Sequence, residues 1–180
     1  MFVFLKNRLY CVPGYFLSKF LSLIPSFRLS ALIINAFNPE VSLDSKIHSN
    51  VRFVIPTRIS IGDGSTINGG AFIDARCGIA IGSNTMIGRG VKIFTLGHDI
   101  HDPEFKSVGG KVTIGNNVVI FPYTIIMPGV TIGNNVVVYP GSVVTKDIED
   151  NNVVAGVPAK YIKMRENMTY TLNYNTFFGV

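Results

Sequence analysis

Aliphatic residues return every six positions along most of this chain. From Ile114 the series runs through Ile120, Ile126, Ile132, Val138 and Val144. Three shorter series upstream keep the same spacing. A helix would repeat every 3.6 residues, whereas self-similarity at this short fixed period indicates a solenoid of stacked coils. We expect three six-residue units per coil, with coils beginning near Val41, Ile61, Ile81, Ile114 and Ile132.

The residue four places after each aliphatic position is small or branched, which suits a corner between two short strands. In the upstream coils these positions are Ser45, Val51, Thr57, Ser65, Ala71, Cys77, Thr85, Val91 and Gly97. Gly and Asn supply the left-handed backbone that a bend needs. Two residues are extra in each of two successive coils, and we assign them to Ile59-Ser60 and Ile79-Ala80. Because one coil cannot bury its own core, the stack is the expected stable unit.

The repeat has one long interruption. A new unit is due near residue 99, but the pattern resumes only at Ile114. The insert, residues 97–112, contains Gly97-His98-Asp99-Ile100-His101-Asp102-Pro103-Glu104-Phe105 and so holds two of the three histidines. Loops longer than a rigid scaffold requires usually carry function. This extended loop after the third coil is therefore the first candidate for chemistry.

Composition indicates one globular domain, because 47% of the 180 residues are hydrophobic and 15% are charged. We expect an N-terminal helical cap at 1–40, the solenoid at 41–158 and a C-terminal tail at 159–180. The two cysteines do not suggest a disulfide framework, since Cys77 falls at an inward corner and Cys11 precedes the solenoid. A reducing cytoplasm is then the expected location.

A net charge of +5 is compatible with a nucleic acid, an anionic membrane or a phosphorylated ligand. The basic residues are dispersed, and neither a helix-turn-helix nor zinc-ligand spacing is visible, which argues against nucleic acid. A phosphorylated ligand is favoured by the basic residues near the end of the chain, Lys146, Lys160, Lys163 and Arg165. A solvated basic face is the alternative.

The first 37 residues are apolar but interrupted by Lys6, Arg8, Lys19 and Arg28, and no run reaches the roughly 18 apolar residues of a membrane span. The simplest interpretation is a helix ending near Pro25 and a second helix that begins after an N-cap at Ser26 and stops before Asn38-Pro39. We favour a role as a cap on the open end of the solenoid. The alternative is peripheral contact of a basic and aromatic face with the cytoplasmic face of the inner membrane.

Three features together resemble the hexapeptide-repeat acyltransferases: the six-residue units, the Gly97-His98 loop, and the endings Pro140-Gly141-Ser142-Val143-Val144-Thr145-Lys146-Asp147 and Ala155-Gly156-Val157-Pro158-Ala159-Lys160. The chain is most similar to the maltose and galactoside O-acetyltransferase branch and its polysaccharide-modifying relatives. The resemblance implies an all-β solenoid of the left-handed parallel β-helix type, a homotrimer, and acetyl transfer from acetyl-CoA between subunits without a metal. Handedness comes from the resemblance alone, since crossover connections are usually right-handed.

The resemblance makes His98 the catalytic residue, and imidazole chemistry agrees. A neutral imidazole can take the proton of a sugar hydroxyl as that oxygen attacks a thioester. The resemblance also places Asn68, Asp74 and His101 among the substrate-binding residues. For Asn68 the alternative is a structural asparagine in a turn, and for Asp74 it is a solvated outward side chain.

For the acyl donor, Thr145 and Lys146 match positions that line the pantetheine and phosphate end of coenzyme A. Lys160 and Lys163 stand where the family has basic residues that meet the nucleotide phosphates, and positive charge suits those phosphates. Gly141-Ser142 would let the backbone approach the pantetheine arm. The chain departs from the family at Val119-Ile120-Phe121, where Trp-Ile-Gly is common.

These features favour O-acetylation of a sugar hydroxyl in a surface polysaccharide (capsule, O-antigen or exopolysaccharide) or its precursor. The alternatives are N-acetylation of an amino sugar, acetylation of serine or a xenobiotic, and a non-enzymatic β-helix scaffold. A zinc carbonic anhydrase of this architecture would need three histidines on one metal. His48 lies in the first coil, far along the chain from His98 and His101.

Overall fold

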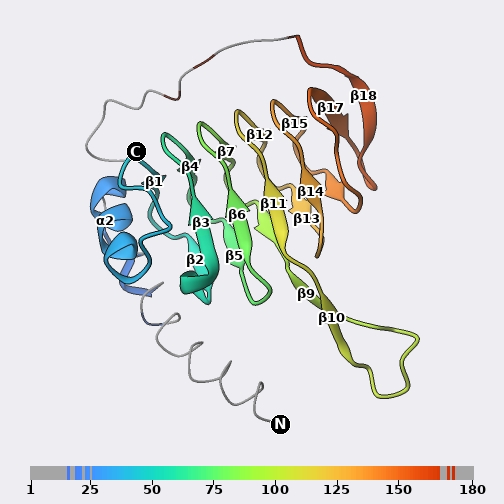
Figure 1. Cartoon of the computed structure of the whole chain (residues 1–180), viewed down its shortest axis with the longest axis horizontal. Helices are drawn as coiled ribbons and strands as arrows, with labels where there is room; N and C mark the ends of the chain where they lie inside the picture. Colours follow the sequence, from blue (N-terminus) through green and yellow to red (C-terminus); the bar gives the residue numbers. More distant parts are fainter. Residues whose placement is uncertain are drawn as a thin grey trace.

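The computed structural model describes residues 16, 19–21, 23–24, 26–166, 170 and 172, and these form a parallel β-solenoid of about five turns with a helix at one end (Figure 1). The first helix expected before Pro25 lies mostly outside the described residues.

Each full coil contributes one short strand to each of three parallel sheets. Sheet A contains β3 (Ile59–Ile61), β6 (Ile79–Ile81), β11 (Val112–Ile114) and β14 (Thr131–Ile132). Sheet B contains β1 (Lys46–Ile47), β4 (Thr66–Ile67), β7 (Met86–Ile87), β12 (Val119–Ile120), β15 (Val137–Val138), β17 (Asn152–Ala155) and β18 (Lys160–Met164). Sheet C contains β2 (Arg52–Val54), β5 (Phe72–Asp74), β8 (Lys92–Ile93), β13 (Ile125–Ile126) and β16 (Val143–Val144).

The predicted coil starts are confirmed by the strand register. Val41, Ile61, Ile81, Ile114, Ile132 and Ile148 form one stacked series, each paired with the next. All six side chains are buried. Ile148 thus begins a final partial coil, whereas its place four residues after Val144 in the six-residue count predicts a corner residue. One aliphatic residue from each coil stacks on its counterpart in the next coil, and this stacking in the core explains why aliphatic residues recur along the chain.

The corner after sheet C differs from the expectation. The buried corner residues there are Ile55, Ala75 and Thr95, two places after the strand's aliphatic residue instead of four. Thr57 is therefore exposed and Cys77 is only half-buried, so Cys77 is not an inward corner residue. The extra residues lie in this corner, where a 3-10 turn (Pro56–Arg58) follows Ile55. The assignment to Ile59-Ser60 and Ile79-Ala80 was wrong, because both pairs are regular strand residues of sheet A.

The sequence Gly-Asn-Asn occurs at residues 115–117 and again at 133–135, and packing between coils at the corner after sheet A explains it. A Cβ on Gly115 would lie 2.8 Å from the Asn134 side chain of the next coil. In that next coil, Asn134 Oδ1 accepts a 2.9 Å hydrogen bond from the Asn116 N–H. The second asparagine of each motif has a left-handed backbone, as at Asn117 and Asn135. Glycine therefore makes room for the asparagine that ties the coils together.

Replacing Gly82 with alanine is expected to destabilise the solenoid, because the new Cβ would lie 2.5 Å from Asn116 Oδ1 and 2.7 Å from the Gly115 carbonyl. Overpacking of this kind costs about 1–3 kcal/mol of unfolding free energy, or roughly 3–10 °C in the melting temperature. Thermal unfolding checks it. The matched control is Gly97→Ala, where the nearest atom is 3.9 Å away and little change is expected.

Helix α2 (Phe27–Phe37) packs on the first coil. Ser26 is its N-cap and the helix stops before Asn38-Pro39, as the sequence predicts, with Asn38 as the C-cap. The Asn38 side-chain amide donates to the carbonyls of Pro56 at 2.9 Å and Ile59 at 2.6 Å, which fixes the helix end to the solenoid. The Phe27 ring stacks on His48, with 5.3 Å between ring centroids. Burial, with a smaller contribution from Arg89, lowers the pKa of His48.

The expected C-terminal tail at 159–180 is partly structured. Strand β18 pairs antiparallel with β17 and so extends sheet B. Beyond it, the Leu172 carbonyl accepts a 3.0 Å hydrogen bond from Lys46 Nζ, and the Leu172 N–H donates to Asn84 Oδ1 at 3.0 Å. Part of the expected tail therefore packs against the solenoid, through β18 and Leu172.

Candidate active site

The insert after the third coil is a β-hairpin. β9 (Leu96–His98) pairs antiparallel with β10 (Ser107–Gly109), with His98 opposite Ser107. The hairpin projects from the solenoid between sheets C and A (Figure 1). At its root, a side chain at Gly109 would collide with the Thr95 carbonyl and Leu96. The expected loop at 97–112 is thus a defined element that holds His98 on a strand.

His98 is exposed, and its ring is held by Phe105. The imidazole stacks on the Phe105 ring, with centroids 4.5 Å apart and planes 4° from parallel. Its Nδ1 lies 2.9 Å from the Phe105 carbonyl oxygen. A carbonyl can only accept, so Nδ1 carries the hydrogen and Nε2 of the neutral ring keeps a free lone pair. The arrangement presents one basic nitrogen in a fixed orientation.

The tip of the hairpin is held by its own polar groups. Asp99 Oδ1 accepts from the His101 N–H at 2.9 Å, and the Asp102 carbonyl accepts from the Phe105 N–H at 2.8 Å. Phe105 has a φ of 49°, in the left-handed region. These contacts place the Phe105 carbonyl beside His98. His101 lies at the same tip and is exposed. Its contact with substrate stays a prediction.

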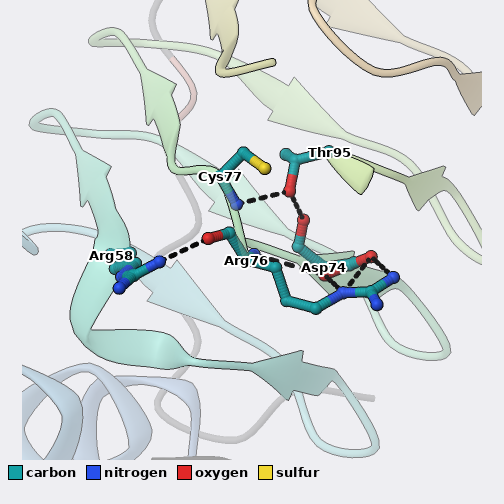
Figure 2. A network of polar contacts seen from close by, with 5 residues as sticks. All are labelled: Arg58, Asp74, Arg76, Cys77 and Thr95. Atoms are coloured by element: carbon teal, nitrogen blue, oxygen red, sulfur yellow. Dashed lines mark hydrogen bonds and ion pairs between the residues drawn. The ribbon is translucent and has the colours of Figure 1, made fainter. Parts of the chain in front are cut away.

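Thr95, at the root of the hairpin, connects it to the preceding coil (Figure 2). This side chain is fully buried. Its hydroxyl donates to the Asp74 carbonyl at 2.8 Å and accepts from the Cys77 N–H at 2.9 Å. The Thr95 carbonyl in turn accepts from the Gly110 N–H at 3.0 Å, where the chain re-enters the solenoid. Both ends of the hairpin are thereby tied to Thr95.

Asp74 belongs to the same network, and its carboxylate is 1% exposed. Arg76 holds that carboxylate through Nε at 2.9 Å from Oδ1 and Nη2 at 2.7 Å from Oδ2. The Arg76 carbonyl accepts from Arg58 at 2.5 Å, which extends the network to the coil before (Figure 2). The alternative of a solvated outward Asp74 is wrong, because the side chain is buried and paired. A contact between Asp74 and substrate stays a prediction.

Replacing Thr95 with valine is expected to loosen the hairpin selectively. Valine keeps the shape but leaves the Asp74 carbonyl and Cys77 N–H without their partner, at a cost of about 1–3 kcal/mol. Amide hydrogen exchange in residues 96–109 should accelerate about tenfold relative to β12. Thr95→Ser, which keeps the hydroxyl, is the control. Equal exchange in the threonine and valine proteins would show that the hydroxyl does not hold the hairpin.

Asn68 lies at another corner, between sheets B and C, and its side-chain amide donates to the Ile87 carbonyl at 3.0 Å. This contact links two coils, as expected of a structural asparagine in a turn. Within the chain, Asn68 is on a different edge of the solenoid from the hairpin that carries His98. Its role in substrate binding stays a prediction.

The residues expected to bind the acyl donor lie at the C-terminal end of the solenoid. Thr145 and Lys146 follow β16 and are exposed. Gly141 has a φ of 68°, and a Cβ added to it would have no atom within 4 Å, so its surface is open. The Ser142 side chain is fully buried, with its hydroxyl donating to the Tyr139 carbonyl at 2.7 Å. Only the backbone at Gly141-Ser142 is therefore suited to meet a ligand.

A β-bulge brings Lys160 and Lys163 to one face of β18. Lys160 pairs with Ala155 and Lys163 with Val153, because the register shifts between Val153 and Val154. Partners two places apart on a strand share a face, so the two lysines do as well. Without the bulge, a separation of three would send them to opposite faces. Both ammonium groups are thus available to one ligand.

Lys146 lies close to the start of β18. A cavity of about 260 Å³ is lined by Lys146, by Ala159 and Tyr161 on either side of Lys160, and also by the carboxylates of Asp147 and Glu149. Asp147 is engaged, since its Oδ1 accepts from the Thr131 N–H at 2.7 Å. The structure therefore brings the three predicted donor-binding lysines to one end of the molecule.

Within a single chain, the predicted general base and the lysines predicted to bind the acyl donor lie apart. The hairpin with His98 and the strand β18 with Lys160 and Lys163 project from different sides of the solenoid (Figure 1). Sequence reasoning gave no role to Phe105 or Thr95, although both lie in or beside the insert. Among the described residues, no three His, Cys, Asp or Glu side chains are grouped to hold a metal ion.

Comparison with known proteins identifies the fold. Residues 111–146 match the family described as Bacterial transferase hexapeptide (six repeats). A maltose O-acetyltransferase from Clostridium difficile 630 is 32% identical, with 91% of this chain and 88% of that chain covered and a TM-score of 0.78. A galactoside acetyltransferase in complex with coenzyme A is 28% identical, with 93% and 90% covered and a TM-score of 0.75.

A Dictyostelium discoideum protein, named an acetyltransferase by inference, is 44% identical over 108 residues. That match spans 58% of this chain and 57% of the Dictyostelium protein, so the chain covers little more than half of that relative. The coil architecture matches the left-handed parallel β-helix of the solved structures. The chain belongs to the hexapeptide-repeat acetyltransferases.

Proposed function

We propose that this protein transfers an acetyl group from acetyl-CoA to a hydroxyl of a saccharide, with His98 as the general base. The observation that carries the proposal is the hydrogen bond between His98 Nδ1 and the Phe105 carbonyl at 2.9 Å. It fixes the tautomer in which Nε2 is the proton acceptor. Exposure of the ring on a projecting hairpin leaves that nitrogen accessible to an acceptor.

The proposed reaction is a direct transfer in which His98 acts as the base. The saccharide oxygen attacks the thioester carbonyl while its proton passes to Nε2 of His98. A C–O bond forms, the C–S bond breaks, and the departing thiolate takes the proton back from the imidazolium to give free coenzyme A. A hydroxyl is a poor nucleophile at neutral pH, so removing its proton during attack lowers the barrier. No covalent acyl-enzyme is needed.

Acetyl-CoA is supported as the donor by family membership and by the basic face of β18. The related galactoside acetyltransferase was solved with coenzyme A, and a hexapeptide-repeat acetyltransferase from Vibrio cholerae with acetyl-CoA. In this chain Lys160 and Lys163 offer two ammonium groups on one face, which suits a pyrophosphate and a 3′-phosphate. Thr145 and Lys146 would meet the pantetheine end.

A homotrimer would complete the site. His98 and the lysines of β18 project from different sides of one solenoid, so a single donor molecule does not connect them within the chain. In a closed threefold assembly every subunit presents one side to the next, which allows the hairpin of one copy to face β18 of its neighbour. Light scattering should then report three copies per particle, and an active strict monomer would rule out the shared site.

The acceptor class is tested by incubating the protein with acetyl-CoA and a panel of saccharides, and measuring release of the free thiol. The panel contains neutral monosaccharides, oligosaccharides of surface polysaccharides, amino sugars, serine and a xenobiotic amine or alcohol. We expect release with saccharides that lack a free amine, and better turnover with oligosaccharides, because the exposed hairpin leaves room for a polymer. Release with amines alone would replace O-acetylation by N-acetylation.

A further inference from the structure

Helix α2 is apolar on both of its faces. The inner face packs on the solenoid, where Phe27, Ala31 and Ile34 are buried. The outer face is apolar too, because Leu29 and Leu32 are about half exposed and the helix contains a single charge, Arg28. Helices that are apolar all round are normally covered on every side. The outer face of α2 therefore indicates a second contact.

Exposed apolar side chains also occur in the described residues that flank the outer positions of α2 in the sequence. Among the described residues before Asn38, the large apolar side chains with at least 45% exposure are Phe16, Phe20, Leu23, Leu29, Leu32 and Phe37. Isolated exposed apolar residues are common on proteins, but contiguous groups mark interaction sites. We call this group, together with Lys19 and Arg28, the N-terminal patch.

Charge identifies the kind of partner. Residues 1–39 contain four basic residues and no acidic residue, out of 16 basic and 11 acidic in the chain. The other 141 residues thus carry 12 positive and 11 negative charges and are nearly neutral. Lys19 and Arg28 are both exposed within the N-terminal patch. A second protein copy would have the same positive charge and repel it, whereas an anionic lipid surface attracts it.

We propose that the N-terminal patch docks the protein on an anionic lipid surface, with α2 lying in the plane of the interface. Among the described residues no helix is long and apolar enough to cross a membrane, and α2 has only 11 residues. Apolar side chains of such a helix enter the boundary between headgroups and acyl chains while basic residues meet the lipid phosphates. The cap and the lipid contact use opposite faces of α2, so they are compatible, although the sequence alone favoured the cap.

Vesicle cosedimentation of the full chain tests the proposal. At about 0.1 M salt we expect the protein to sediment with vesicles containing phosphatidylglycerol and to remain in solution with pure phosphatidylcholine. Near 1 M salt, where the Debye length is about 3 Å, it should be released. Leu29→Gln with Leu32→Gln should weaken binding about tenfold or more, since the apolar contact is lost. Lys19→Gln with Arg28→Gln should weaken it about 10- to 30-fold, from roughly 1 kcal/mol per charge.

The matched control is Ile100→Gln with Val108→Gln, two exposed aliphatic residues on the β9–β10 hairpin, for which unchanged binding is expected. Thermal unfolding and light scattering show that each variant is folded and has the wild-type oligomeric state. No binding of the wild-type protein, or equal binding of the Leu29/Leu32 variant, overturns the proposal. A change of oligomeric state in that variant, with no vesicle binding by the wild type, assigns the N-terminal patch to a contact between copies instead.

Discussion

Replacing His98 with alanine is expected to lower turnover by about 10² to 10⁴-fold, the contribution typical of a positioned general base. The affinity for acetyl-CoA should stay within a few-fold of wild type, because the substitution removes a proton acceptor and not one of the residues predicted to bind the donor. A thiol-release assay measures turnover, and calorimetry measures binding of acetyl-CoA. Normal turnover of the alanine protein would exclude His98 as the base.

His98→Asn distinguishes the role of His98 as a base from its hydrogen bond to the Phe105 carbonyl. The asparagine amide can still donate to the Phe105 carbonyl that holds Nδ1 at 2.9 Å in the wild type, but it cannot accept a proton. If His98 acts as a base, the asparagine protein should be as inactive as the alanine protein. Retention of activity by asparagine would mean that His98 serves to hold the hairpin tip.

Replacing Lys160 and Lys163 together with alanine is expected to raise the KM for acetyl-CoA about tenfold or more while kcat changes little. Contacts with the nucleotide phosphates are the same in ground state and transition state, so their loss weakens binding uniformly. Both lysines are exposed, so salt should screen the interaction and reduce the difference between wild type and variant. Steady-state kinetics at low and high salt measure both parameters.

The control for that experiment is Arg89→Ala with Lys92→Ala, which removes two exposed positive charges from the third coil. In sheet B that coil is separated from β18 by β12, β15 and β17. If net charge alone governed the encounter with acetyl-CoA, the control would raise KM by the same factor. If kcat of the Lys160/Lys163 protein fell by as large a factor as its KM rose, a role confined to the nucleotide would be contradicted.

The sequence predicted the coils well because their core is periodic. Each stacked aliphatic position packs on its counterpart in the next coil, as Ile81 pairs with Ile114 across the 33 residues that include the insert. The helix start at Ser26 and its stop before Asn38-Pro39 were equally visible, since both depend on local chemistry. The corner after sheet C was not, because Ile55 and Ala75 turn inward two places early and the extra residues have no pattern of their own.

The site was predictable only in part. His98 could be found from the interrupted repeat and the family resemblance, but its orientation depends on the Phe105 carbonyl, a backbone group set by a φ of 49° at a non-glycine residue. Likewise, the shared face of Lys160 and Lys163 depends on a bulge opposite Val153. Neither a left-handed φ at phenylalanine nor a register shift leaves a signal in the spacing of side chains.

Tracing the acetyl group distinguishes direct transfer to a hydroxyl from transfer to an amine or through the protein. The protein is given acetyl-CoA labelled with ¹³C at the carbonyl carbon together with an active saccharide, and the label is located by NMR of the product and by mass spectrometry of the protein. We expect an ester carbon on the saccharide, an equal amount of free thiol, and an unlabelled protein throughout turnover. Label in an amide, or on a protein side chain that then passes it to the acceptor, would contradict direct transfer to a hydroxyl by His98.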